Sequence, residues 1–295
     1  MNEAKPAGPL ADLSPQQRLE RAREAGDTLM RLHGPRELHA AVLALILPPG
    51  SQRARRAWRA ETEAGTRAAT LREHVLNLPA AARLPWLETL ACRARDQSLD
   101  SRQALLAATR RVMAARGVVR PIDRLHWLAL RQWLGEGTAA QHRAAAAEDL
   151  SRLPQGEVSA IAAYSAFLSR LVPVDASATP PGADAAPPAD PLPTPGQAWY
   201  ATVMTPWRPH ADVPPCHPPD TDGLVHALRE LQTMAWMQRP MLARRWVTSA
   251  HQHATEGAPG RLDATAADAL RLSCTLLDSP LPPELAQHFG SAASP

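Results

Sequence analysis

The sequence predicts an all-α protein. Its 295 residues are rich in Ala, Leu and Arg, whereas aromatic residues make up only 4% of the chain. Ala, Leu and Arg lose little side-chain freedom in a helical turn, so this composition favours helix over strand. Apolar residues also recur at the three- and four-residue spacing of a helix face, and proline or glycine separates one such stretch from the next.

Local signals predict where the first helices begin and end. Ser14 is followed by Pro at the first helical position and by Gln three residues on, which is the pattern of a capping box. This helix is expected to end at Gly34, and the next to begin at Pro35. The stretch 51–77 then reads as Arg-rich helix interrupted by a glycine at position 65.

The central stretch 78–134 predicts three amphipathic helices joined by short polar turns. Asp100 or Ser101 is the expected cap of the second of these helices, and Gly117 its expected end. A weaker version of the same pattern returns at 224–285, so we interpret the two stretches as similar helical units.

Proline content suggests the domain division. Between 173 and 222 the chain is dominated by Pro, Ala, Asp and Thr, and such a stretch buries too little apolar surface to offset the entropy of ordering. An apolar island from Trp199 to Trp207 within it predicts a short helix docked on a neighbouring bundle. Two further helices are expected at 138–153 and 157–171. The predicted organisation is a disordered lead-in (1–13), an N-terminal helical bundle (14–172), a Pro-rich linker (173–222) and a C-terminal helical unit (223–295).

Charge and cysteine usage limit the class of protein. The formal net charge of +3 is small for this length, and Arg alternates with acidic residues as on a solvated helical surface. The three cysteines are far apart and odd in number, which indicates no disulfide framework and a reducing compartment. No apolar run approaches the roughly 20 residues that cross a bilayer. We therefore expect a soluble cytoplasmic protein.

Three stretches carry a family resemblance: RLPWLETL at 83–90, RQALLAATRRVMAARGVV at 102–119, and GRLDATAADALRLSCTLLDSPLPPEL at 260–285. They resemble the C-terminal cytoplasmic region of bacterial membrane zinc metallopeptidases of the HtpX type, a region similar to the small helical TerB-like fold. The resemblance covers most of 38–134 and 224–285. It implies two TerB-like units joined by the Pro-rich linker, and a location that includes the periphery of the inner membrane.

The chain departs from this family at the residues that carry chemistry. A zinc peptidase needs His-Glu-x-x-His, and none of the eleven His residues here is followed by Glu. TerB-like units carry an acidic set able to hold a cation, of which only Asp123 and Asp268 remain as vestigial positions. A hard cation needs several converging oxygen ligands, so a lone carboxylate near Arg predicts an ion pair instead. We therefore predict no catalytic residue, no metal and no cofactor.

A basic, Trp-containing helix is the clearest candidate for an interaction surface. Arg53, Arg56 and Arg59 surround Trp58 and form either a face for anions or a solvated face paired with nearby carboxylates. Trp58, Trp199 and Trp207 lie in less apolar company than the other tryptophans. Because Trp is enriched at interfaces, these three are the predicted exposed contact residues.

Together these features predict a non-catalytic helical accessory protein that binds another protein. The resemblance suggests a membrane metallopeptidase or a stress-response complex as the partner. One alternative is a nucleic-acid or anionic-surface binder that uses the Arg clusters. It is less favoured for nucleic acid because the helix after Gly117 presents Trp and Leu rather than the polar residues of a recognition helix. Another alternative is the detached C-terminal part of a zinc metallopeptidase.

Overall fold

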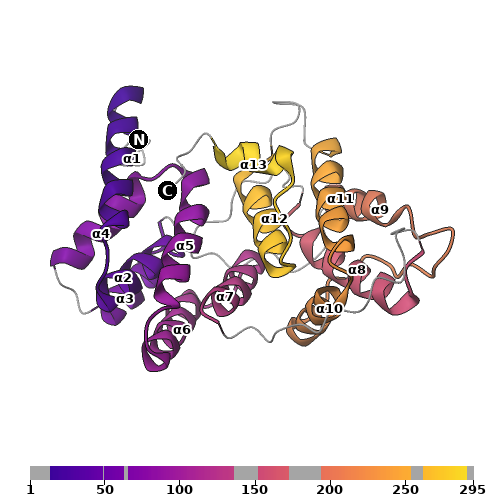
Figure 1. The fold of residues 1–295 in the computed structure, drawn as a ribbon, viewed down its shortest axis with the longest axis horizontal. Coiled ribbons are helices and arrows are strands. Elements are labelled where there is room, and N and C mark those ends of the chain that lie inside the picture. The colour runs from indigo at the N-terminus through magenta and orange to yellow at the C-terminus, as the bar shows by residue number, and fades with distance from the viewer. Residues whose placement is uncertain are drawn as a thin grey trace, which may run out of the picture. The chain divides into compact units, whose positions relative to one another are not determined.

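A computed structural model describes residues 14–48, 50–62, 66–135, 152–172, 194–253 and 262–290. Within these ranges the chain forms thirteen α-helices and no strand, so the predicted all-α class is confirmed (Figure 1). The expected helix at 138–153, except for its last two residues, and residues 173–193 of the Pro-rich segment lie outside the described residues.

The chain divides into two compact units, residues 1–116 with the last four residues, and residues 117–291. The first unit holds six described helices, α1 (Pro15–Met30), α2 (Pro35–Leu45), α3 (Gln52–Glu61), α4 (Thr66–Asn77), α5 (Ala80–Ala94) and α6 (Leu99–Ala114). Helix α2 is the centre of this unit, because α3, α4, α5 and α6 all pack against it. Seven of its eleven residues are buried, so the short apolar helix predicted after Gly34 forms the core.

The helix boundaries in the first unit follow local chemistry. The Ser14 hydroxyl accepts a hydrogen bond from the Gln17 amide, and the Gln17 side chain accepts one from Ser14 N, which confirms the capping box. Helix α6 is capped by Ser98 rather than by the predicted Asp100 or Ser101. Gly117 has φ 87°, the left-handed conformation that commonly ends a helix and that glycine adopts without penalty.

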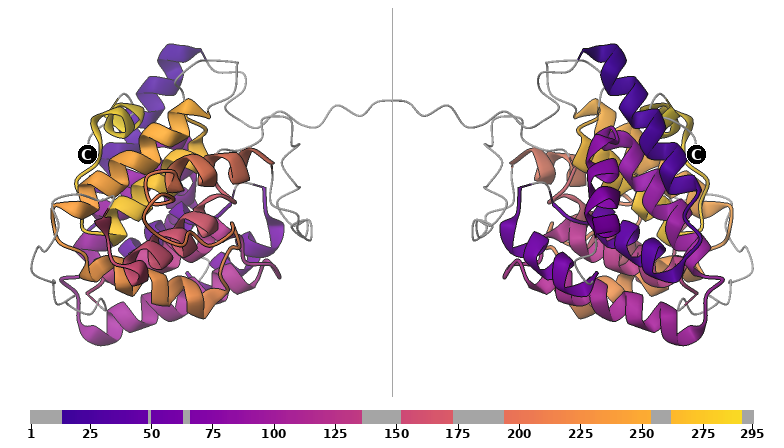
Figure 2. Two further views of the ribbon diagram at one scale, coloured as in Figure 1. Left: turned by 90° about the vertical axis from the view of Figure 1, so that its right-hand side faces the viewer. Right: turned by 90° about the vertical axis from the view of Figure 1, so that its left-hand side faces the viewer.

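The second unit holds seven described helices, α7 (Pro121–Trp133), α8 (Gln155–Leu168), α9 (Thr194–Met204), α10 (Thr221–Thr233), α11 (Gln238–Gln252), α12 (Ala264–Leu276) and α13 (Pro283–Gly290). Helix α8 packs against α9 and α10, and α11 packs against α9 and α12. Helix α12 also contacts α7 and α13. The left view of Figure 2 shows the orange α11 beside the yellow α12.

This division differs from the one suggested by the Pro-rich segment. Helices α8 and α10 flank that segment in sequence, yet they form the most extensive helix pair of the second unit. Helix α7, the third helix of the central stretch 78–134, belongs to the second unit and packs on α12. The unit boundary at Gly117 is therefore set by the burial of apolar faces between helices that are distant in sequence. The proline content of the chain does not indicate this boundary.

An aromatic and hydroxyl cluster fills the core of the second unit. The rings of Tyr164 and Trp246 are stacked with centroids 5.4 Å apart. Trp246 Nε1 donates to Ser165 Oγ at 3.0 Å, and Tyr164 Oη donates to Ser273 Oγ at 3.1 Å. Each buried polar group of this cluster thus has a partner, which is the condition for burying it without a large desolvation cost.

Candidate functional site

The three tryptophans predicted to be exposed are buried, so they are removed as interface residues. Trp58 is only 2% exposed, and its Nε1 donates to Ala40 O at 3.1 Å, which anchors α3 on α2. Trp199 and Trp207 are fully buried. The helix α9 that carries Trp199 does dock on its neighbours, as predicted, but these side chains are what holds it there. The local sequence around these tryptophans gives no sign of burial, because it does not show which helices pack on them.

The vestigial acidic positions do not converge on a metal site. Asp123 Oδ1 accepts from Arg120 Nη2 at 2.8 Å, and Asp123 Oδ2 accepts from Arg120 N at 3.0 Å. The predicted ion pair is therefore confirmed, and it also caps the start of α7. Asp268 lies half-buried on α12. Across the part of the chain that the structure describes, no three His, Cys, Asp or Glu side chains gather in a way that could hold a metal ion.

The basic residues of α3 form a face that extends to another helix. Arg53, Arg56 and Arg59 are exposed, as predicted. Burial lowers the pKa of Arg72 on α4, and the charges of Arg55 and Arg59 lower it further, so these guanidinium groups lie near one another. Sequence spacing could not reveal Arg72, because α3 and α4 come together only through their common packing on α2.

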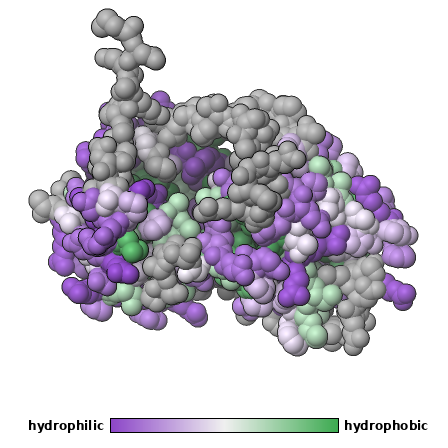
Figure 3. All heavy atoms as spheres, turned by 90° about the horizontal axis from the view of Figure 1, so that it is seen from above, coloured by the Kyte–Doolittle hydropathy of each residue, from purple (hydrophilic) through white to green (hydrophobic). Residues whose placement is uncertain are grey.

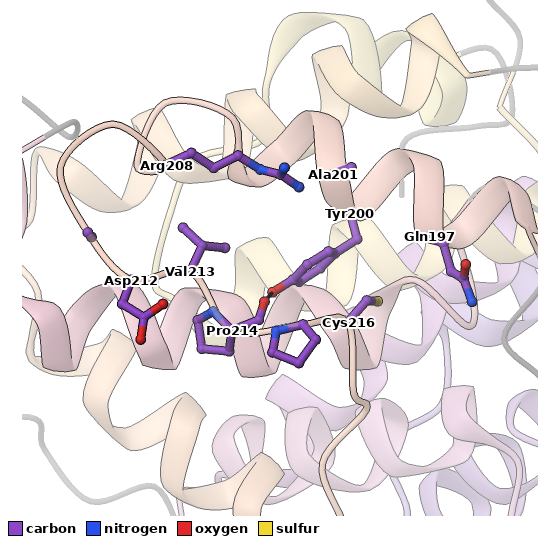
Figure 4. Close-up of a pocket in the computed structure, with 10 residues that line it drawn as sticks. Gln197, Tyr200, Ala201, Arg208, Asp212, Val213, Pro214 and Cys216 are labelled. Atoms are coloured by element: carbon purple, nitrogen blue, oxygen red, sulfur yellow. Dashed lines mark hydrogen bonds between the residues drawn. The ribbon is translucent and has the colours of Figure 1, made fainter.

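A pocket of about 420 Å³ lies between α9 and the chain that follows it (Figure 4). Its apolar walls are the Tyr200 ring, Val213 and two prolines, and Arg208 extends along one side. The Gln155 side chain holds this loop at Asp212. Its amide donates to Asp212 O at 2.7 Å, and its carbonyl accepts from Asp212 N.

The groups in this pocket are arranged for structure rather than for catalysis. Tyr200 Oη donates to Pro214 O at 2.6 Å, and burial raises the pKa of this phenol to about 12. Burial also raises the pKa of the Cys216 thiol, which lies 3.5 Å from Ser169 Oγ. A nucleophilic cysteine needs a lowered pKa and an adjacent base, and Cys216 has neither among the described residues.

A surface feature that the sequence did not predict lies at the turn between α10 and α11. Trp236, Met237 and Met241 are 69%, 56% and 44% exposed, and they are the only large apolar residues exposed in close succession within the described ranges. Hydrophobic residues on the face drawn in Figure 3 form small separate areas among mostly hydrophilic ones. An exposed tryptophan beside two exposed methionines is an apolar cluster of the kind that marks interaction sites.

The turn exposes Trp236 because its neighbours are pinned to the core. Met234 and Ala235 are buried, and Gln238 N donates to Ala235 O at 2.9 Å. The buried Arg239 guanidinium donates to Met234 O at 3.1 Å and to Leu277 O at 3.0 Å. These bonds fix the backbone on both sides of Trp236, and its side chain is exposed before any partner binds.

The exposed residues continue along one side of α11. We call the set Trp236, Met237, Met241, Arg244, Thr248 and Gln252 the α11 outer face; from Met237 on, its members recur at spacings of three and four residues. Beside it lies a groove of about 430 Å³ lined by residues of α9 and α11, namely Thr202, Met241, Arg244, Arg245, Thr248, Ser249 and Gln252. The opposite side of α11 is buried against the core.

Comparison with known proteins identified no family and no relative. A scan against models of protein families, a search of curated proteins and a search of solved structures each found no match. Among the described residues, no helix combines the length and the apolar character needed to span a bilayer.

Sequence reasoning missed the α11 outer face for an identifiable reason. Helical spacing places Ala235 at the end of the α10 stripe and begins the next stripe at Leu242, so the residues between them carry no surface prediction. The structure ends α10 at Thr233 with Met234 as its C-cap, and Trp236 and Met237 follow as exposed residues. The usable signal was Trp236 two residues before a helix that contains three Arg and no acidic residue.

Proposed function

We propose that this protein is a non-catalytic helical interaction protein that binds another protein through the α11 outer face. The observation that carries the proposal is the exposed, pre-oriented Trp236 beside Met237 and Met241. Tryptophan is among the residues most enriched at binding hot spots, and methionine adapts its shape to varied partners. Arg244, exposed on the next turn of α11, extends this surface with a positive charge.

The partner class is proposed from the sequence resemblance. The stretches 83–90, 102–119 and 260–285 resemble the cytoplasmic region of HtpX-type membrane metallopeptidases, so a membrane peptidase or stress-response complex is the proposed partner. The chain would then act as an accessory to chemistry carried by that partner. Its own His residues supply no His-Glu-x-x-His motif.

Replacing Trp236 by Ala is expected to weaken partner binding by about tenfold or more, because burying an aromatic anchor contributes a large share of binding free energy. Fold stability should stay within about 0.5 kcal/mol of wild type, since the side chain is mostly in solvent. The measurement is quantitative mass spectrometry of proteins captured from native extract by wild-type and W236A chains.

The matched control is Leu19→Ala on α1, which removes an exposed apolar side chain of the first unit. A protein captured by wild type and L19A but lost with W236A, and then bound directly as a purified partner, supports the proposal. If W236A and L19A capture the same proteins in the same amounts as wild type, the α11 outer face is not an interaction surface.

The basic face of α3 and α4 supports a second candidate function, the binding of nucleic acid or another polyanion. Arg53, Arg56 and Arg59 are exposed there, and burial together with the charge of Arg55 lowers the pKa of Arg72. If this face neutralises about three phosphates, the logarithm of the binding constant for duplex DNA should fall with the logarithm of salt concentration with a slope of about −3. The triple variant R53Q/R56Q/R59Q should flatten that slope. A slope unchanged by the triple substitution, or no binding at low salt, would rule this function out.

A further inference from the structure

The two helices that line the groove beside the α11 outer face carry positive charge only. Helices α9 and α11 contain no Asp or Glu, whereas α11 carries three Arg residues. Arg244 is exposed and makes no hydrogen bond or ion pair with the described residues. Complementary charge favours association and rejects like-charged partners, so this face selects for a negatively charged one.

Arg245 contributes charge while being held in place. Its Nε donates to Val203 O at 2.6 Å, and its Nη2 donates to Thr202 O at 2.8 Å, both at the C-terminal end of α9. The guanidinium also lies 5.8 Å from the centre of the Trp207 ring. Because two of its N–H groups are bonded to carbonyls of α9, Arg245 is held as a fixed positive charge at the groove, and the exposed Arg244 is the guanidinium placed to contact a ligand directly.

The shape of the surface indicates a helix as the occupant. From Met237 to Gln252 the outer face runs about 20 Å along α11, with its apolar residues at one end and its polar residues at the other. The neighbouring groove of about 430 Å³ provides a hollow for side chains that project from one face of a helix. A flat bilayer does not fill such a hollow, whereas side chains that project from one face of a helix do.

We propose that the partner segment is an acidic amphipathic helix that lies along α11, with apolar side chains against Trp236, Met237 and Met241 and carboxylates beside Arg244. This inference rests on the interaction role proposed above and specifies the chemistry of what is bound. The contact is a helix-in-groove interaction, in which apolar anchors at helical spacing supply affinity and the charges select the partner.

Two synthetic helical peptides test the proposal against the full-length chain. Each is about 16 residues long, matching the outer face in length, with the same Leu stripe on one side; one carries Glu on the flanking positions and the other Lys. Fluorescence anisotropy with a labelled peptide should show the Glu peptide binding about tenfold or more tightly than the Lys peptide at low salt, with the difference shrinking as salt rises.

Variants locate the binding surface. R244Q should weaken binding of the Glu peptide by about threefold, the size expected for an exposed charge pair, and leave the Lys peptide unaffected or slightly better bound. W236A should weaken the Glu peptide by about tenfold. The matched control R23Q removes a charge from α1 in the first unit and should change neither.

The outcomes separate this inference from the function on which it rests. Equal affinity for the two peptides, or a preference for Lys, overturns the acidic partner while leaving the surface open to another protein. If neither peptide binds but W236A still loses a native partner, only the proposal that the partner segment is a helix is overturned. Binding to vesicles of phosphatidylcholine and phosphatidylglycerol that depends on Trp236, without peptide binding, replaces the helix with a lipid surface. If W236A changes neither peptide binding, nor vesicle binding, nor the capture of a native partner, the proposed interaction role is wrong.

Discussion

Replacing Trp246 by Ala is expected to lower the free energy of unfolding of the second unit by about 4 kcal/mol, near the upper range for truncating a buried aromatic residue. Trp246 is 1% exposed and stacks on Tyr164 with ring centroids 5.4 Å apart. Its Nε1 donates to Ser165 Oγ, and its own carbonyl accepts from Trp199 Nε1 at 3.4 Å. Truncation therefore opens a cavity where α8, α9 and α11 meet and leaves a buried hydroxyl without its donor. The measurement is urea unfolding of the full chain followed by circular dichroism.

Two further variants give this prediction its controls. Trp246→Phe keeps an aromatic ring against Tyr164 and removes only the indole donor, so it should cost about 1–2 kcal/mol. Trp236→Ala makes the same Trp-to-Ala change at an exposed position of the same unit, and should cost less than about 0.5 kcal/mol. Equal stability losses for W246A and W236A would contradict the assignment of one indole to the core and the other to the surface.

Acidification from pH 7 to pH 4 is expected to destabilise the protein by about 3 kcal/mol through His126 alone. Burial lowers the pKa of this imidazole from 6.5 to about 4, an effect larger than the raising influence of Asp123 or the lowering influence of Arg120. His126 Nδ1 is buried and has no hydrogen-bond partner among the described residues, so a proton there gains no acceptor. The measurement is the free energy of unfolding in urea at a series of pH values.

The direction follows from which state binds the proton. Above pH 6.5 the imidazole is neutral in both states and its contribution to stability is constant. Between pH 6.5 and about 4 the unfolded chain binds a proton that the folded chain does not, so stability falls as the pH falls. Below about pH 4 both states are protonated and the loss is complete.

His126→Gln should remove most of this slope, because glutamine stays neutral across the range. His226→Gln, which changes an exposed histidine on α10, is the matched control and should leave the slope as in wild type. A smaller slope should remain in H126Q, since burial also lowers the pKa of His39 in the first unit. The hydrogen bond from Arg111 lowers the pKa of Glu61, so that pair is lost only below pH 4.5, outside most of the histidine window. An H126Q chain with the full wild-type slope would contradict the prediction.

Short-range signals predicted the helices well. The capping box at Ser14, the start at Pro35 and the end at Gly117 all depend on backbone groups within one turn, and each is confirmed. The interruption at position 65 likewise separates α3 from α4. The Arg120–Asp123 ion pair was predictable because both residues lie within the first turn of one helix.

Signals that depend on distant partners failed. The polarity of their sequence neighbours predicts Trp58, Trp199 and Trp207 at the surface, but each is buried by packing against other helices. Proline content predicts a boundary between units at 173–222, but α8 and α10 on either side of it pack together. Local composition indicates how a segment would behave by itself in water. It does not indicate which apolar face of another helix covers that segment in the fold.

The sequence alone determined that this protein is helical, where most of its helices start and stop, and that it lacks the motif of a zinc peptidase. These properties follow from propensities, caps and residue order, which act within a few residues. Tertiary structure alone decided which tryptophans are buried, where the two units divide, and that Trp236 faces outward beside Arg244. The reason is that burial depends on packing between segments distant in sequence: Arg239 bonds to Met234 O and to Leu277 O, and that long-range tie turns Trp236 toward solvent.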